Sequence, residues 1–231
     1  MIREQLTDGV LTVVLDRPDK RNAMTIEMRD YLENLGARCN GDDDVRCVVI
    51  TGAGQVFSAG ADLRELQEHD GEVPNTNPTV GVAAVNCPVI AAVDGMCVTG
   101  GLEVALAADI IVASPAARFS DTHAKLGVVP RWGMTKLLTD RIGEARTTEM
   151  MLTGRWVEAD EGARIGLVDV LLGAVSFDDD VAGIAQAIAD RDPALVTALR
   201  GLIADNASRS FADALVAEAD VGAAFGLDGG I

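Results

Sequence analysis

Apolar runs without polar alternation recur through the first three quarters of the chain and predict strands that are buried on both faces. These runs are VRCVVIT (45–51), PVIAAVDG (88–95), DIIVAS (109–114) and LVDVLL (167–172). The stretch Val10–Asp16 follows Asp8-Gly9 and predicts the second arm of a hairpin. Helical spacing lies between and after the runs, near 100–107, 135–142 and 144–153. Strands separated by helices in this way predict an α/β fold.

The remaining patterns divide the chain into two parts. Thr25 is a predicted N-cap for a helix that buries Met28, Leu32 and Leu35, whereas the Pro- and Asn-rich residues 75–79 predict a surface loop. From Asp178 onward the spacing is helical only, as in VAGIAQAIA and FADALVAEA. We therefore predict an α/β core over residues 1–175. A helical segment over residues 176–231 is predicted to pack on that core or on a neighbouring subunit.

Composition narrows the range of partners. The chain has 36 acidic and 19 basic residues, and its formal net charge of −17 disfavours nucleic acid or an anionic membrane surface. A ligand that carries phosphate would need a local basic patch. No apolar run reaches about 18 residues without a charge, so no membrane span is predicted. The cysteines lack C-x-x-C spacing, so no metal site is predicted. The first residues lack a signal-peptide pattern, which predicts a cytoplasmic protein.

Two glycine-rich stretches follow strands. TGAGQVFSAGADL fails the dinucleotide-binding fingerprint, because Phe57 stands where the third glycine is required. In CVTGGLEVALAAD, two glycines open a helix whose free N–H groups can stabilise an oxyanion, and Glu103 lies on the same helix face as Gly100. An acid beside an oxyanion site suits proton transfer next to an enolate. Tight packing of small residues with an exposed Glu103 is the alternative interpretation.

Several motifs in a fixed order resemble the crotonase superfamily, the enoyl-CoA hydratase/isomerase family. The motifs are RPDKRNAMT, VVITGAGQVFSAGADLRE, PVIAAVDGMCVTGGLEVALAADIIVAS and ARFSDTHAKLGVVPRWG, and the resemblance covers roughly residues 10–169. It implies a spiral of ββα turns with a helical C-terminal part, assembled as trimers or paired trimers. The implied ligands are acyl-CoA thioesters, and no cofactor is implied because CoA is part of the substrate.

The resemblance also assigns the site. The backbone amides of Ala61 and Gly100 match the oxyanion hole, while the loop DKRN and the stretch 59–64 match the segments that contact CoA. The residues assigned to substrate and CoA binding are Lys20, Arg21, Ala23, Ala59, Ala61, Asp62, Leu63, Arg64 and Gly100. Met96 and Trp132 are assigned to the acyl pocket, because the family's usual P-G-A-G turn here reads P-R-W-G. Trp132 could instead belong to the core.

In the hydratases of this family, two glutamates hold and activate water. Glu103 matches the first of them, and His123 stands at the position of the second. An imidazole can exchange protons near neutral pH, so Glu103 and His123 are the predicted catalytic residues. Hydration of a 2-enoyl-CoA is the leading hypothesis, although the histidine departs from the family pattern and could merely line the pocket.

Three alternatives stay open. Double-bond isomerisation needs Glu103 alone. Thioester hydrolysis would use Cys97 or Thr99 as nucleophile and His123 as base, but no G-x-S-x-G elbow is present and Asp121 is not an obvious group to orient the histidine. A non-catalytic acyl-CoA-binding homologue would keep the oxyanion hole and lack the second acid.

Overall fold

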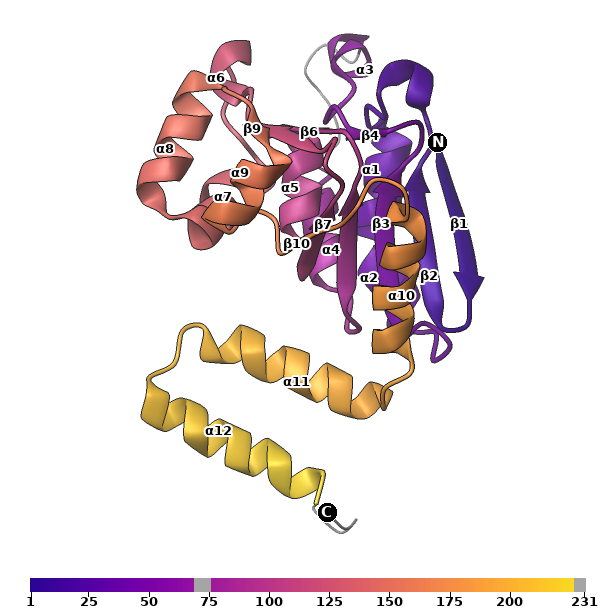
Figure 1. The fold of residues 1–231 in the computed structure, drawn as a ribbon, viewed down its shortest axis with the longest axis vertical. Coiled ribbons are helices and arrows are strands. Elements are labelled where there is room, and N and C mark those ends of the chain that lie inside the picture. The colour runs from indigo at the N-terminus through magenta and orange to yellow at the C-terminus, as the bar shows by residue number, and fades with distance from the viewer. Residues whose placement is uncertain (69–75, 227–231) are drawn as a thin grey trace.

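The computed structural model describes residues 1–68 and 76–226, and its larger sheet runs through the centre of the molecule (Figure 1). The strand order is β1-β2-β3-β5-β7-β10, and only the first pair is antiparallel. The bounds are β1 Ile2–Thr7, β2 Val10–Leu15, β3 Cys47–Gly52, β5 Val89–Val93, β7 Ile110–Ala113 and β10 Val170–Leu171. The predicted hairpin is confirmed, with Asp8 and Gly9 both at positive φ in its turn. Of LVDVLL, only Val170 and Leu171 form a strand, and they are half-buried and exposed, so the prediction of a strand buried on both faces is wrong there.

The second sheet is small and was not predicted. Its order is β4-β6-β8-β9, with bounds β4 Val56–Ser58, β6 Met96–Val98, β8 Arg118–Ser120 and β9 Val157–Glu158. Strands this short leave no readable period in a sequence. The chain enters the large sheet, then the small sheet and then a helix, as in β5-β6-α5 and β7-β8-α6. The expected spiral of ββα turns is therefore confirmed.

Helices cover both faces of the large sheet (Figure 1). The bounds are α1 Ile26–Glu33, α2 Leu35–Cys39, α3 Leu63–Glu68, α4 Pro78–Ala83, α5 Gly100–Leu106, α6 His123–Leu126, α7 Met134–Ile142, α8 Glu144–Thr153, α9 Ala159–Ile165, α10 Phe177–Ala189, α11 Pro193–Asn206 and α12 Phe211–Ala224. The 3₁₀ helix η1 spans Pro18–Lys20. On one face, apolar side chains of α1, α4 and α5 pack on the sheet. On the other face, α10 buries Phe177, Val181, Ala185 and Ala189, which recur every fourth residue.

Helix starts explain where two predictions succeed and fail. Thr25 caps α1 by accepting a hydrogen bond from the Met28 amide at 3.2 Å, as predicted, but Leu35 belongs to α2. The predicted loop over 75–79 is wrong at its end, because Asn77 is the N-cap of α4 and Pro78 its first residue. Asn75 lies outside the described residues.

The last two helices differ from the rest. Neither α11 nor α12 has a buried residue, and Figure 1 shows both set apart from the sheets beyond the end of α10. An ion pair of 2.8 Å between Arg200 of α11 and Asp109 ties them to the core. The division of the chain into a core and a separately packed C-terminal segment stays a prediction. Among the described residues, no helix is long and apolar enough to cross a membrane.

Replacing Gly81 by Ala is expected to destabilise the protein, because α4 crosses α1 at this residue. A β-carbon on Gly81 would lie 2.1 Å from the carbonyl oxygen of Leu32 and 2.2 Å from that of Glu33. Overpacking of this kind costs roughly 1–3 kcal/mol. Gly183 in α10 is the matched control, since its β-carbon would meet nothing within 4 Å. Urea unfolding should show Gly81→Ala losing stability and Gly183→Ala keeping or gaining it; equal effects would contradict the packing argument.

Candidate active site

The loop between β6 and α5 holds Thr99 in a strained conformation, with φ +53° and ψ −113°. Positive φ is a genuine outlier for a β-branched residue and persists only where surrounding contacts enforce it. Here the Thr99 amide donates to the carbonyl of Ser120 at 3.0 Å, and its hydroxyl lies 2.5 Å from that of Thr122. These bonds fix the direction in which the next amide, that of Gly100, points.

The amides of Ala61 and Gly100 lie side by side. Gly60, at φ +92°, accepts a hydrogen bond from the Met24 amide at 2.7 Å and turns the chain toward α5. A β-carbon on Gly100 would stand 3.3 Å from the Ala61 nitrogen. Within the described residues, neither amide has a hydrogen-bond acceptor. Two free donors held this close can receive one oxygen atom that carries negative charge.

Glu103 lies in the first turn of α5 and is only 1% exposed. Its Oε1 accepts hydrogen bonds from the amides of Trp132 at 3.0 Å and Met134 at 3.1 Å. Burial raises the pKa of Glu103, although the Met134 amide, His123 and the Trp132 amide oppose the rise. The alternative of an exposed Glu103 is therefore wrong. A buried carboxyl with a raised pKa is suited to proton transfer near neutral pH.

His123 begins α6 and faces Glu103. Its Nε2 lies 3.9 Å from Oε2 of Glu103, and its Nδ1 lies 2.5 Å from Oδ1 of Asp121. Asp121 is fully buried. Because a carboxylate only accepts, Nδ1 carries the proton in the neutral ring and Nε2 presents its lone pair toward Glu103. Asp121 was not an obvious group to orient the histidine in the sequence, but in the structure it holds the ring.

Trp132 forms a wall beside the two amides. A β-carbon on Gly100 would come within 2.5 Å of Cζ3 of the indole, so the ring lies directly against the Gly100 backbone. The Trp132 carbonyl accepts from the Thr79 hydroxyl at 2.7 Å, which ties the wall to α4. Met96 begins β6, at the end of that strand away from Gly100. The structure thus brings Trp132, but not Met96, to the site, and the pocket role of Met96 stays a prediction.

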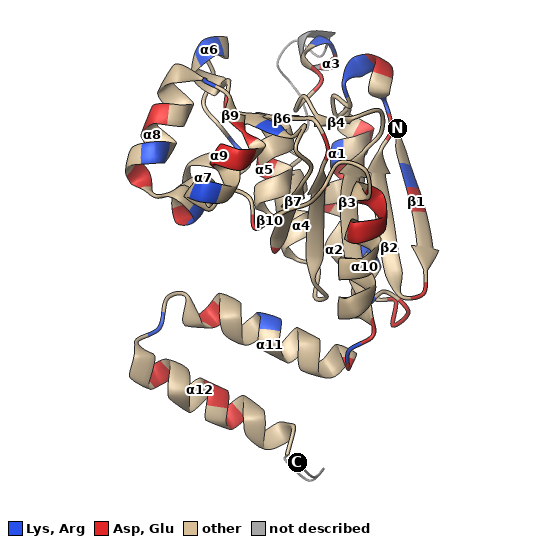
Figure 2. Ribbon diagram, in the orientation of Figure 1, with Lys and Arg blue, Asp and Glu red and all other residues tan. Residues whose placement is uncertain are grey.

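The segments assigned to CoA lie against each other. The amide of Ala59 donates to the carbonyl of Arg21 at 2.9 Å, and Met24 bridges to Ala61. Arg17 forms an ion pair of 3.0 Å with Asp62, so the carboxylate of Asp62 already has a partner within the protein. Lys20, Arg21, Leu63 and Arg64 are exposed, Ala23 and Ala59 half-buried. Figure 2 shows basic residues near the N-terminal strands and on α3 at this edge of the molecule, as a phosphate-bearing ligand would require in a chain of net charge −17.

The structure disfavours covalent chemistry at the two predicted nucleophiles. Cys97 is fully buried, and burial raises the pKa of its thiol well above the usual range. The hydroxyl of Thr99 is engaged with Thr122 rather than with His123. Neither group is therefore activated by the histidine as thioester hydrolysis would require.

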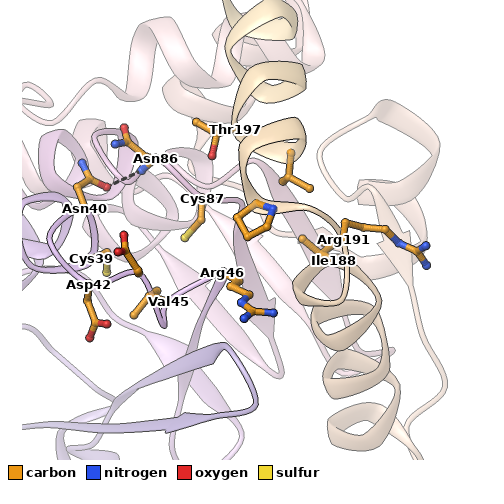
Figure 3. Close-up of a pocket in the computed structure, with 13 residues that line it drawn as sticks. Cys39, Asn40, Asp42, Val45, Arg46, Asn86, Cys87, Ile188, Arg191 and Thr197 are labelled. Atoms are coloured by element: carbon orange, nitrogen blue, oxygen red, sulfur yellow. Dashed lines mark hydrogen bonds between the residues drawn. The ribbon is translucent and has the colours of Figure 1, made fainter. Parts of the chain in front are cut away.

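A separate cavity of about 190 Å³ lies at the opposite end of the large sheet, between α2 and the junction of α10 and α11 (Figure 3). Arg46 and Cys87 precede β3 and β5, so the cavity is at the amino ends of the parallel strands, away from Gly100. Burial raises the pKa of Cys39 to about 11 and that of Cys87 to about 12, so both thiols stay protonated at neutral pH. Its thiols therefore offer no nucleophile.

Comparison with known proteins shows to which protein family the chain belongs. The sequence model of the family described as "Enoyl-CoA hydratase/isomerase" matches residues 5–226. The chain belongs to this family. It is an enzyme of the enoyl-CoA hydratase/isomerase type, and acyl-CoA is the ligand class of the family. Within the described residues, no group of three or more His, Cys, Asp or Glu side chains could hold a metal ion.

Individual family members resemble it over most of its length. "Probable enoyl-CoA hydratase 1, peroxisomal" of Arabidopsis thaliana is 32% identical over 91% of this chain and 80% of its own. The carnitinyl-CoA dehydratase of Proteus mirabilis is 37% identical over 83% and 76%. The crystal structure of enoyl-CoA hydratase from Bacillus anthracis superposes with a TM-score of 0.88 at 28% identity, over 98% and 92%. The fold predicted from the motifs is therefore confirmed.

The raised pKa of Glu103 predicts how stability changes with pH. A carboxyl whose pKa is higher in the folded than in the unfolded state stabilises the fold at low pH, and this contribution is lost as the pH rises. Because Gln stays neutral, the stability of Glu103→Gln relative to wild type should increase as the pH rises from about 4, the usual carboxyl range, toward neutrality. Urea unfolding across this range measures the difference; a difference that does not change with pH would contradict the raised pKa.

Proposed function

We propose that the protein hydrates a 2-enoyl-CoA to the 3-hydroxyacyl-CoA. The observation that carries the proposal is the pair Glu103 and His123, separated by 3.9 Å and placed beside the free amides of Ala61 and Gly100. The amides donate hydrogen bonds to the thioester oxygen and stabilise the enolate that forms when water adds. One member of the pair takes a proton from water as its oxygen joins C3, and the other delivers a proton to C2.

Asp121 favours hydration over isomerisation, which needs only one acid–base group. A hydrogen bond of 2.5 Å to Asp121 stabilises the imidazolium that forms if His123 accepts a proton. A side chain that merely lines a pocket has no need of such support. Return of the proton between the two groups after each turnover requires a bridging water or a closer approach, because Nε2 of His123 and Oε2 of Glu103 lie 3.9 Å apart.

Purified protein with crotonyl-CoA tests the proposed reaction. Hydration removes the conjugated double bond, so the ultraviolet absorbance of the enoyl thioester should fall and mass spectrometry should show the addition of one water. A 3-enoyl-CoA in a parallel reaction tests isomerisation. Conversion of the 3-enoyl to the 2-enoyl thioester without hydration would contradict the proposal and favour the isomerase alternative.

We propose further that the protein is a homo-oligomer, a trimer or a pair of trimers, in the cytoplasm. The support is the apolar surface that α11 and α12 leave exposed, where Ile203 is 75%, Phe211 81% and Val216 62% exposed. Light scattering after size exclusion should give a trimer or hexamer, and Ile203→Asp should dissociate it. A wild-type monomer would contradict the proposal.

A further inference from the structure

Arg29 is a buried cation that forms no ion pair with any acidic residue in the part of the chain that the structure describes. It lies one turn into α1, and only 4% of its surface is exposed. Its Nε has no hydrogen-bond partner, and within the described residues its guanidinium forms neither a hydrogen bond nor an ion pair. A buried charge is costly unless it is paired. An arginine in this state suits a ligand that brings the missing charge.

Two described carboxylates, those of Glu65 and Asp30, influence Arg29 but do not pair with it. Glu65 and Asp30 act on it only through space, and Oε2 of Glu65 already accepts a hydrogen bond from the Ile26 amide at 2.6 Å. Over residues 1–68 and 76–226, the direct partner of the guanidinium is the face of Trp132, whose ring centre lies 5.8 Å from the guanidinium carbon. That distance is close to the outer limit of a cation–π contact, so the ring compensates little of the lost hydration.

Trp132 also connects this cation to the oxyanion site. The same indole lies against the Gly100 backbone and under the Arg29 guanidinium. An acyl group whose thioester oxygen is held by Ala61 and Gly100 can therefore run along the ring and bring its far end to Arg29. The Trp132 ring therefore separates the guanidinium from the oxyanion site, and the width of one ring suits a short acyl chain.

We propose that Arg29 binds a carboxylate at the far end of the acyl group, so that the preferred substrates are short CoA thioesters of dicarboxylic acids. The inference rests on the acyl-CoA site proposed above. The planar guanidinium fork matches a carboxylate in two parallel hydrogen bonds, which would satisfy the orphaned Nε. A methyl end would leave the buried charge unpaired.

Binding of saturated thioesters tests this inference without turnover. Calorimetry compares glutaryl-CoA, which ends in a carboxylate, with hexanoyl-CoA, which has similar length and a methyl end. Hexanoyl-CoA would leave the buried guanidinium without its partner, so wild type should bind glutaryl-CoA at least about 30-fold more tightly than hexanoyl-CoA. Arg29→Met should abolish this preference. Arg29→Lys keeps the charge without the fork and should retain part of the preference. Arg164→Met, which removes an exposed arginine on α9, should retain all of it.

The outcomes separate this inference from the proposed reaction. If wild type binds glutaryl-CoA no more tightly than hexanoyl-CoA, the role of Arg29 is overturned, whether or not Arg29→Met folds. A preference for glutaryl-CoA that survives in Arg29→Met would overturn it as well. Hydration of crotonyl-CoA without any preference for glutaryl-CoA would leave the reaction standing and the inference refuted. A preference that depends on Arg29, in a protein that hydrates no enoyl-CoA, would support the inference and refute the reaction.

Discussion

Replacing Glu103 by Gln is expected to lower kcat by roughly 10²–10⁴ with little change in KM. The amide oxygen of Gln can still accept the hydrogen bonds from the amides of Trp132 and Met134, so the loop after α6 keeps its place. The oxygen that faces His123 becomes an NH₂ group, which cannot exchange a proton with water or with the imidazole. The loss therefore falls on the chemical step, and initial rates with crotonyl-CoA measure it.

Asp169 provides a matched control for Glu103. Its carboxylate also accepts a hydrogen bond from a backbone amide, that of Ile111 at 2.7 Å, but it lies beside β10 rather than at the site. Asp169→Asn should therefore keep kcat. A wild-type rate in Glu103→Gln would assign Glu103 to structure alone and would contradict both hydration and isomerisation as proposed.

The longer strands of the large sheet and the N-terminal hairpin could be predicted from the sequence. The strands β3, β5 and β7 at the centre of the large sheet are buried on both faces over most of their length, so each appears as an unbroken apolar run, and the Asp8-Gly9 turn marks the hairpin. The small sheet is not readable, because β4, β6 and β8 have three residues each. The start of α4 was mistaken for a loop because Asn and Pro serve equally in turns and at helix N-termini.

The sequence motifs selected two pairs of residues that the structure places close to each other. The amides of Ala61 and Gly100 adjoin one another and Glu103 faces His123, while the catalytic roles of all four stay a prediction. Asp121 was considered but not chosen as the group that orients the histidine, although its place two residues before His123 was a usable signal. The stacking of Arg29 on Trp132 joins residues more than one hundred positions apart. No pattern in a single sequence reports such a contact.

The second large effect is expected from the pair His123 and Asp121. His123→Ala should lower kcat by roughly 10²–10⁴, because it removes one of the two proton-transfer groups. Asp121→Asn should cost roughly 10² or more, since the amide no longer stabilises the imidazolium and can hold the wrong tautomer. Little change in KM is expected in either case, because neither side chain lies on the segments assigned to CoA.

A double-mutant cycle distinguishes a positioning role of Asp121 from a merely structural one. If Asp121 acts only through His123, Asp121→Asn should cost almost nothing in a protein that already carries His123→Ala. A structural role predicts the reverse, namely that the two losses multiply in kcat. Urea unfolding of all four proteins provides the stability control, because Asp121 is fully buried and its loss acts on the fold as well. If the two losses in kcat multiply in proteins of similar stability, Asp121 does not act through His123. If His123→Ala keeps the wild-type rate, His123 only lines the pocket, and isomerisation through Glu103 becomes the better hypothesis.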